Sequence, residues 1–240
     1  MKNFDNLAEL YNKSLAWSFR EKLELPTIKN WLGNTHSLKV LDYGCGSGGI
    51  SRWLANQGCK QVVGYDSSAN MIYDAQRQET NEPKNIEYFN KLDAFAHHQF
   101  DVVAAIYVLP YATHKMHLLS LIQNMYHALS SQGRVIVITL SPDFSSDPEY
   151  YRPYGFRLIG QEPRHDGSCV DLILYSGQKR YTLPAYYYSM QTLESAFLQT
   201  GFSNVSTLSY STSSLDNDPT LFDYLQCPHT VIITATKAIP

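Results

Sequence analysis

The chain has 240 residues, of which 44% are hydrophobic, and carries a formal net charge of −3 without a long run of Lys or Arg. Its length fits one domain, with room for an insertion. Its charge argues against a nucleic-acid substrate, whose phosphates need a basic protein face, and we expect no such partner.

Four scattered cysteines form no CxxC pair, which favours a reducing compartment over a disulfide or zinc framework. The N-terminus lacks the apolar core of a signal peptide, and the longest apolar run, Val102 to Pro110, is too short to cross a bilayer. We therefore expect a cytoplasmic protein that has no membrane partner.

Residues 4–32 have apolar side chains at helical spacing, and Pro26 is expected to start a new helical turn. The stretch 40–49, VLDYGCGSGG, then reads as a buried strand, a glycine-rich turn and the start of a helix. Glycines allow positive φ and a close approach by a ligand, and a helix start offers unpaired N–H groups. This pattern predicts a site for a nucleotide-like ligand.

Gly44, Gly46 and Gly49 match the glycine pattern of dinucleotide sites, but two acids favour another ligand. Asp42 would repel a pyrophosphate, whereas it suits an ammonium group, directly or through water. Asp66 ends the second predicted strand, where a carboxylate accepts hydrogen bonds from both ribose hydroxyls. One acid for an ammonium and one for a ribose predict S-adenosylmethionine as the cofactor.

The chain continues with alternating strands and helices up to residue 140. Further strands are predicted at 85–89, 102–109 and 134–140, and the nearly continuous apolar run at 102–109 is typical of a central parallel strand. Four prolines then interrupt a tyrosine-rich segment, and a hairpin at 170–175 and 180–183 follows. We interpret residues 141–188 as an insertion over the sheet edge, because so long a break usually serves a purpose.

After a helix at 192–200, two strands at about 205–210 and 230–236, joined by a loop, end the chain. His97 and His98 precede the fourth strand, at its amino end, so they are interpreted as surface or packing residues. His114 and His117 lie three residues apart at the start of a helix, and without a third ligand they predict no metal site.

The segments 40–49, 64–71, 100–111 and 133–139 together resemble the class I S-adenosylmethionine-dependent methyltransferases. The resemblance implies a doubly wound α/β fold: a mostly parallel seven-stranded sheet closed by a C-terminal antiparallel hairpin. It also implies one domain over 1–240, with an N-terminal helical lid at 1–35 and the insertion as a cap. The predicted cofactor-binding residues are Tyr11, Asp42, Gly44, Cys45, Gly46, Asp66, Ser67, Met71, Asp93, Ala94 and Tyr107.

Direct displacement at the methyl group depends mainly on positioning, although a hydroxyl acceptor would need a general base. We assign His114 and Tyr111 as catalytic candidates. The predicted acceptor pocket is walled by Tyr111, Tyr150, Tyr151, Tyr154 and Tyr187, whose flat rings suit a small planar molecule. The alternative is that these rings attach the insertion to the sheet. Tyr11 has the same alternative, as a packing residue of the N-terminal helix.

Within the family, the segments 11–13, 107–112 and 154–156 resemble the small-molecule branch of the toxoflavin-pathway N-methyltransferase. That branch tends to have a histidine where Pro110 stands, so a role that depends on this histidine is lost. Other functions stay open: a cofactor-binding regulatory protein, a protein methyltransferase and, more distantly, a dehydrogenase. We expect a monomer or a homodimer.

Overall fold

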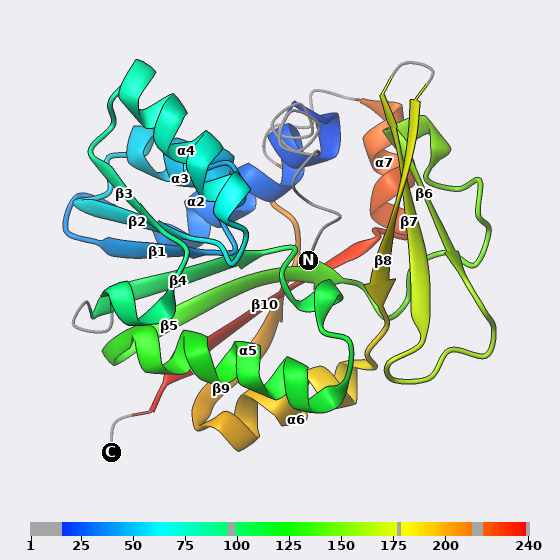
Figure 1. The fold of residues 1–240 in the computed structure, drawn as a ribbon. Coiled ribbons are helices and arrows are strands. Elements are labelled where there is room, and N and C mark those ends of the chain that lie inside the picture. Colours follow the sequence, from blue (N-terminus) through cyan, green and yellow to red (C-terminus); the bar gives the residue numbers. More distant parts are fainter. Residues whose placement is uncertain (1–15, 96–98, 177–178, 213–217, 239–240) are drawn as a thin grey trace.

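The structure is a computed structural model that describes residues 16–95, 99–176, 179–212 and 218–238. Within them, seven strands form a central sheet in the order β3-β2-β1-β4-β5-β10-β9 (Figure 1). The strands are β1 (Lys39–Tyr43), β2 (Gln61–Tyr65), β3 (Ile86–Phe89), β4 (Phe100–Ile106), β5 (Leu129–Leu140), β9 (Phe202–Leu208) and β10 (Thr230–Lys237).

The strand directions confirm the predicted sheet. Strands β3, β2, β1, β4 and β5 are parallel, whereas β10 runs antiparallel to both β5 and β9. The chain builds outward from β1 through β2 to β3 and then returns to place β4 on the other side of β1. This reversal opens a crevice between β1 and β4 at their carboxyl ends, which is where open α/β sheets bind ligands.

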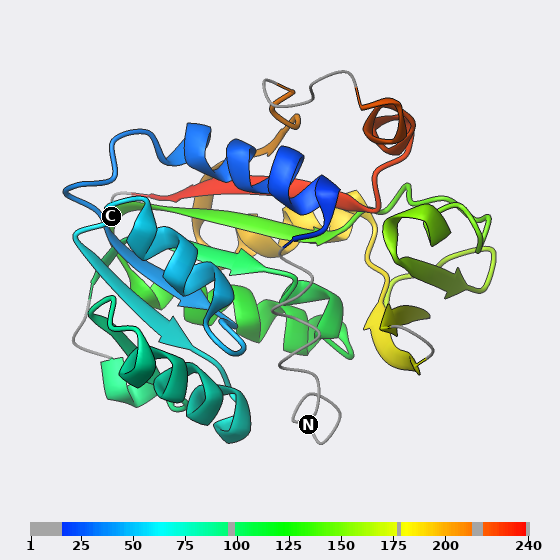
Figure 2. The ribbon, with the colours of Figure 1, turned by 90° about the horizontal axis from the view of Figure 1, so that it is seen from above.

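Helices cover both faces of this sheet (Figures 1 and 2). One face carries α2 (Leu25–Leu32), α3 (Gly49–Asn56) and α4 (Ala69–Asn81), and the other carries α5 (Lys115–Ala128) and α6 (Met190–Thr200). Successive strand residues point to opposite faces. Val40 and Val102 pack with the first group of helices, and Leu41 and Val103 pack with the second. Both faces are therefore buried, which explains the continuous apolar runs.

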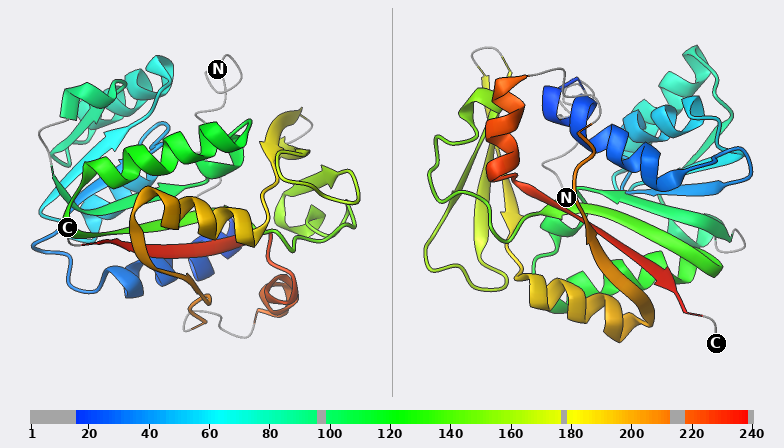
Figure 3. Two further views of the ribbon diagram at one scale, coloured as in Figure 1. Left: turned by 90° about the horizontal axis from the view of Figure 1, so that it is seen from below. Right: turned by 180° about the vertical axis from the view of Figure 1, so that it is seen from behind.

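A second, three-stranded antiparallel sheet lies beyond the carboxyl ends of the central strands (Figure 3). It consists of β6 (Phe156–Gly160), β7 (Cys169–Ser176) and β8 (Lys179–Tyr186). Its core includes Tyr151 and Phe156, and it packs with Phe19 and with α7 (Pro219–Gln226). Phe19 stacks on Tyr224 with the ring centroids 5.1 Å apart. This cluster joins the N-terminal segment, the second sheet and α7.

Three local predictions differ from the structure. The fourth strand ends at Ile106 rather than residue 109, because Tyr107 has a φ of 62° and residues 109–111 form a 3-10 turn. The segment 156–160 adds a strand beside the predicted hairpin. The predicted loop between the last two strands contains α7, which Asp218 caps by accepting a hydrogen bond from the backbone N–H of Thr220.

The N-terminal segment is helical from Arg20 to Leu32, with a π-helical turn, η1 (Arg20–Glu24), that leads into α2. Residues 4–15 of the predicted helix lie outside the described residues, as does His97 with His98. Among the helices that the structure describes, none combines the length and the apolarity needed to cross a membrane.

Candidate functional site

The glycine-rich turn after β1 has the conformation that only glycine adopts without strain. Gly44, Gly46 and Gly48 have φ values of 80°, 54° and 90°. The N–H groups of Gly44 and Cys45 donate to the carbonyl of Tyr65 at 2.7 and 2.8 Å, which ties the turn to the end of β2. A Cβ on Gly46 would meet no protein atom within 4 Å, so the turn leaves open space above it.

This turn borders a cavity of about 680 Å³ at the carboxyl ends of β1, β2 and β4. Its volume lies in the range of small-molecule and cofactor sites. Of the predicted residues, Gly44, Cys45, Gly46, Asp66, Ser67, Met71, Tyr107 and Tyr111 line it. The structure therefore brings most of the predicted cofactor residues into one wall, as the strand order requires.

Two backbone groups orient Asp66 in that wall. Its Oδ2 accepts from the N–H of Gly46 at 2.8 Å, and its Oδ1 accepts from the N–H of Ser68 at 2.9 Å. Ser68 in turn caps α4 by accepting from the N–H of Met71 at 3.3 Å. The carboxylate is thus fixed between the turn and the helix, in the position predicted for an acceptor of ribose hydroxyls.

Asp42 does not face the cavity as predicted. It lies in the central strand β1 between Gly64 and Ala104, is 1% exposed, and accepts a hydrogen bond from Ser51 Oγ at 2.6 Å. Burial raises its pKa to about 7, while the Ser51 hydroxyl opposes this rise and the charge of Asp66 adds to it. Asp42 is not among the residues that line the cavity, and its role toward a ligand ammonium, directly or through water, stays a prediction.

Asp93, another predicted cofactor residue, does not join this wall in the structure. Asp93 and Ala94 lie in a short 3-10 helix (Leu92–Phe95) after β3, and Asp93 is exposed, outside the residues that line the cavity. Tyr11 falls outside the described residues. The structure instead adds wall residues that sequence reasoning missed: Tyr43, Tyr65, Ser68, Thr113, His117, Ser120 and Asn124.

Of the two histidines at the start of α5, His117 and not the predicted His114 lies at the cavity. His114 is exposed and caps the helix, with its Nδ1 accepting from the N–H of His117 at 3.2 Å, whereas His117 lines the cavity. The ring of a capping histidine turns back over its own helix start, which explains the difference. Over the described part of the chain, no cluster of three or more His, Cys, Asp or Glu side chains could hold a metal ion.

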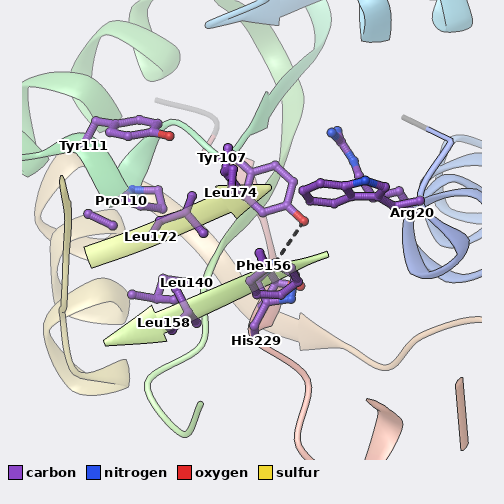
Figure 4. Close-up of a pocket in the computed structure, with 13 residues that line it drawn as sticks. Arg20, Tyr107, Pro110, Tyr111, Leu140, Phe156, Leu158, Leu172, Leu174 and His229 are labelled. Atoms are coloured by element: carbon purple, nitrogen blue, oxygen red, sulfur yellow. Dashed lines mark hydrogen bonds between the residues drawn. The ribbon is translucent and has the colours of Figure 1, made fainter. Parts of the chain in front are cut away.

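A smaller apolar cavity of about 70 Å³ adjoins the first (Figure 4). Its lining includes Pro110, Leu140, Phe156, Leu158, Leu172, Leu174 and Ala185, so it lies between the central sheet and the second sheet. The two cavities share Arg20, Tyr107 and Tyr111. These three side chains therefore stand at the junction between a cofactor-sized space and an apolar space.

Most of the tyrosines predicted to wall an acceptor pocket pack elsewhere. The hydroxyls of Tyr150 and Tyr154 donate to the carbonyls of Asp223 and Thr220 in α7 at 2.8 and 2.7 Å. Tyr151, fully buried, donates to the carbonyl of Cys227 at 2.9 Å. These contacts attach the segment before β6 to α7, whereas the packing alternative had expected the rings to contact the sheet. Tyr111 and Tyr186 line the large cavity, and neither cavity includes Tyr187 in its lining.

A buried polar cluster at the junction was not predicted at all. Glu24 is 1% exposed, accepts a short hydrogen bond from the hydroxyl of Tyr107, and has Arg20 Nε 3.3 Å from its second oxygen. His229 Nε2 lies 3.4 Å from the Tyr107 hydroxyl, and its Nδ1 lies 2.7 Å from the hydroxyl of Tyr224. The sequence carries one signal of this cluster, because the acid Glu24 directly follows Leu23 on a helix side that is otherwise interpreted as apolar.

Comparison with known proteins decides the family. A family model described as a methyltransferase domain matches residues 4–207. The chain belongs to this methyltransferase family. Over 129 residues it is 32% identical to malonyl-[acyl-carrier protein] O-methyltransferase of Enterobacter lignolyticus, which covers 52% of this chain and 46% of that protein. The chain spans about half the length of the curated relatives it matches.

Solved structures show the same fold at low sequence identity. A putative S-adenosylmethionine-dependent methyltransferase of Listeria monocytogenes aligns with a TM-score of 0.62 at 23% identity, over 90% of this chain and 97% of that one. Magnesium protoporphyrin IX methyltransferase of Synechocystis, solved with bound S-adenosylmethionine, aligns with a TM-score of 0.54 at 17% identity, over 98% and 85%. The cavity beside Gly46 and Asp66 has the volume and the oriented carboxylate that the sequence predicts for an S-adenosylmethionine site.

Proposed function

We propose that the enzyme transfers the methyl group of S-adenosylmethionine to a small molecule whose apolar part occupies the cavity between the two sheets. The observation that carries this proposal is the shared wall: Arg20, Tyr107 and Tyr111 border both cavities. A methyl group passing from one space to the other must cross between these side chains. Bound in the larger cavity, S-adenosylmethionine would supply an electrophilic methyl carbon on a positively charged sulfur.

The chain's own residues would hold and orient the two reactants. Gly46 admits the cofactor close to the backbone, Asp66 binds its ribose, and Asp42 acts on its ammonium group through water. The apolar lining, with Leu172 and Leu174, excludes water from the acceptor side. Positioning of this kind accounts for up to roughly 7–11 kcal/mol of a reaction barrier.

The resemblance to the toxoflavin-pathway N-methyltransferase fits a small acceptor but leaves its identity open. Pro110, which replaces the histidine of that branch, lines the apolar cavity. Its ring adds apolar surface there and offers no proton acceptor. We therefore propose an acceptor recognised by shape, with a planar or aliphatic apolar part, rather than one bound through a histidine at residue 110.

The test is incubation with methyl-labelled S-adenosylmethionine and, separately, with a metabolite extract and with cell protein. Label should enter the metabolite fraction. Leu172→Trp, which fills the apolar cavity, should reduce this transfer, whereas Leu198→Trp, on an exposed position of α6, should not. Both variants should bind S-adenosylhomocysteine like the parent. Label in protein would support a protein methyltransferase, and cofactor binding without transfer would support a regulatory protein.

A further inference from the structure

We propose that Glu24 receives, through the hydroxyl of Tyr107, the proton that the acceptor loses when it is methylated. This inference rests on the proposed function, and it assigns the acceptor to molecules with an N–H or O–H at the reacting atom. It begins from a buried carboxylate, Glu24, which lies beside the junction of the two cavities and which the cofactor site does not use.

Glu24 reaches the cavities through one neighbour. Its carboxylate is 1% exposed and is held by Arg20 on one oxygen and by Tyr107 and Thr230 on the other. Tyr107 lines both cavities, whereas Glu24 lines neither of them. A proton can therefore pass from either cavity to Glu24 by way of the Tyr107 oxygen.

Two uncommon backbone conformations meet in this hydrogen bond. Tyr107 has a φ of 62°, a left-handed backbone region that is unfavourable for a residue with a Cβ. Glu24 ends a π-helical turn, a conformation that is rare in proteins and frequent at functional sites. Such strain is retained where the surrounding structure determines it, and it clusters at active sites. Here it turns the Tyr107 side chain back toward η1.

The hydrogen-bond directions fit a relay. Tyr107 donates its proton to Glu24, so its oxygen is left to accept one from another group. Burial lowers the pKa of His229 to about 3, and this neutral ring lies 3.4 Å from the Tyr107 oxygen (Figure 4). Burial also keeps the Tyr107 pKa well above its usual range, so the phenol stays neutral and transmits a proton rather than holding a charge.

The charges around Glu24 set its basicity. Burial is the largest influence and raises its pKa, while the guanidinium of Arg20 and the hydroxyls of Tyr107 and Thr230 oppose the rise. The charge of Glu24 also acts on Tyr210 and Tyr224, whose pKa values burial holds above their usual range, so both phenols stay uncharged. A carboxyl group whose pKa is moved toward neutrality is a better proton acceptor at physiological pH than an exposed one.

A bond forms between the acceptor heteroatom and the methyl carbon, the carbon–sulfur bond breaks, and its electron pair neutralises the sulfonium. The proton on the heteroatom moves to the Tyr107 oxygen as the Tyr107 proton moves to Glu24. An acceptor that is already an anion, such as a carboxylate, has no proton to lose and would face the charge of Glu24. The relay therefore favours an amine, ring nitrogen or hydroxyl acceptor.

Sinefungin tests this without a known acceptor, because it carries an amino group where S-adenosylmethionine carries the transferred methyl. Calorimetry compares sinefungin with S-adenosylhomocysteine on the parent, Glu24→Gln and Tyr107→Phe. The parent should prefer sinefungin by about tenfold or more, as a charge-assisted hydrogen bond allows. Both variants should lose that preference, with S-adenosylhomocysteine binding unchanged within about threefold.

Tyr154→Phe is the matched control, since it removes the hydroxyl of a buried tyrosine that donates to the carbonyl of Thr220 and that lines neither cavity. It should keep the preference. An equal preference in all four proteins would overturn the relay. So would a loss of S-adenosylhomocysteine binding in both relay variants with intact melting temperatures, because that would make the cluster a support for the cofactor site. If the parent binds neither ligand, the proposed function itself fails.

Once an acceptor is found, kinetics give a second readout. Glu24→Gln and Tyr107→Phe should each lower kcat by about 10²–10⁴, the range for losing general base catalysis. The double variant should be no slower than the slower single one, because both substitutions interrupt one path. Additive losses, or an unchanged kcat with a raised KM, would contradict the relay.

Discussion

The backbone N–H of Gly46 donates to Asp66 Oδ2 at 2.8 Å, so the glycine-rich turn after β1 and the acid that ends β2 form one unit. The carbonyl of Tyr65 strengthens it by accepting from the N–H groups of Gly44 and Cys45. A change at Asp66 therefore removes a predicted ligand contact and also loosens the turn that borders the cofactor cavity.

We predict that Asp66→Ala weakens S-adenosylhomocysteine binding far more than Asp93→Ala. Hydrogen bonds to a charged group are worth about 1.5–3 kcal/mol each, so the Asp66 variant should lose at least this much. Asp93 is exposed and outside the cavity lining, and its removal should cost less than about 0.5 kcal/mol. Calorimetry measures both affinities. Equal losses of affinity would mean that Asp93, which follows the third strand, also binds the cofactor.

The parts of the fold that sequence predicted best follow from strong local patterns. Val40 and Val102 begin apolar runs that only strands buried on both faces produce, and the glycines of 44–48 match positive φ. The same reasoning put Asp66 at a strand end, and strand order then fixed its place in the cavity wall.

The features that the sequence does not predict depend on contacts between residues that are far apart in the chain. The Tyr107 backbone turns at a φ of 62°, and its side chain bonds Glu24, 83 positions away, so nothing local in the sequence indicates the end of β4. The sequence predicts the tyrosines of 150–154 as pocket walls, but their partner in the structure is α7, a helix where the sequence predicts a loop. Its start did carry a signal, since Asp218-Pro219 is a typical helix beginning.

Two glycines of the turn should separate cofactor binding from stability. In Gly46→Ala the new Cβ meets no protein atom and projects beside the cavity, so the main loss should be at least about tenfold in S-adenosylhomocysteine affinity, with about 1–2 kcal/mol of backbone strain. In Gly48→Ala the Cβ would lie 2.5 Å from Tyr88 Oη, so this variant should lose more stability. Urea unfolding and calorimetry on both variants check the contrast, which reversed effects would refute.

The two histidines of α5 give a third prediction. His114→Ala removes an N-cap and should cost about 0.5–2 kcal/mol of unfolding free energy, while turnover falls by less than about a hundredfold. His117→Ala, in the cavity wall, should change the KM for cofactor or acceptor more than His114→Ala does. Complete loss of turnover in His114→Ala, with cofactor binding intact, would instead identify His114 as a base.

The last prediction concerns stability at low pH. Burial, assisted by the charge of Arg20, lowers the pKa of His229 from 6.5 to about 3, so the ring is neutral in the fold. In the unfolded chain it takes up a proton below about 6.5. The unfolded state then binds more protons than the folded one, and the unfolding free energy must fall as pH falls from 6.5 toward 3. Above 6.5 this contribution is constant.

A single histidine changes this free energy by at most about 1.4 kcal/mol per pH unit. We therefore expect urea unfolding between pH 7 and 4 to show a shallower decline for His229→Gln than for the parent. His165→Gln, at an exposed position, should follow the parent, which separates the buried ring from histidines in general. Comparing slopes rather than absolute stabilities allows for packing lost in the variant. Equal slopes in all three proteins would mean that His229 has the same pKa in the folded and the unfolded chain, which would contradict a buried, neutral ring.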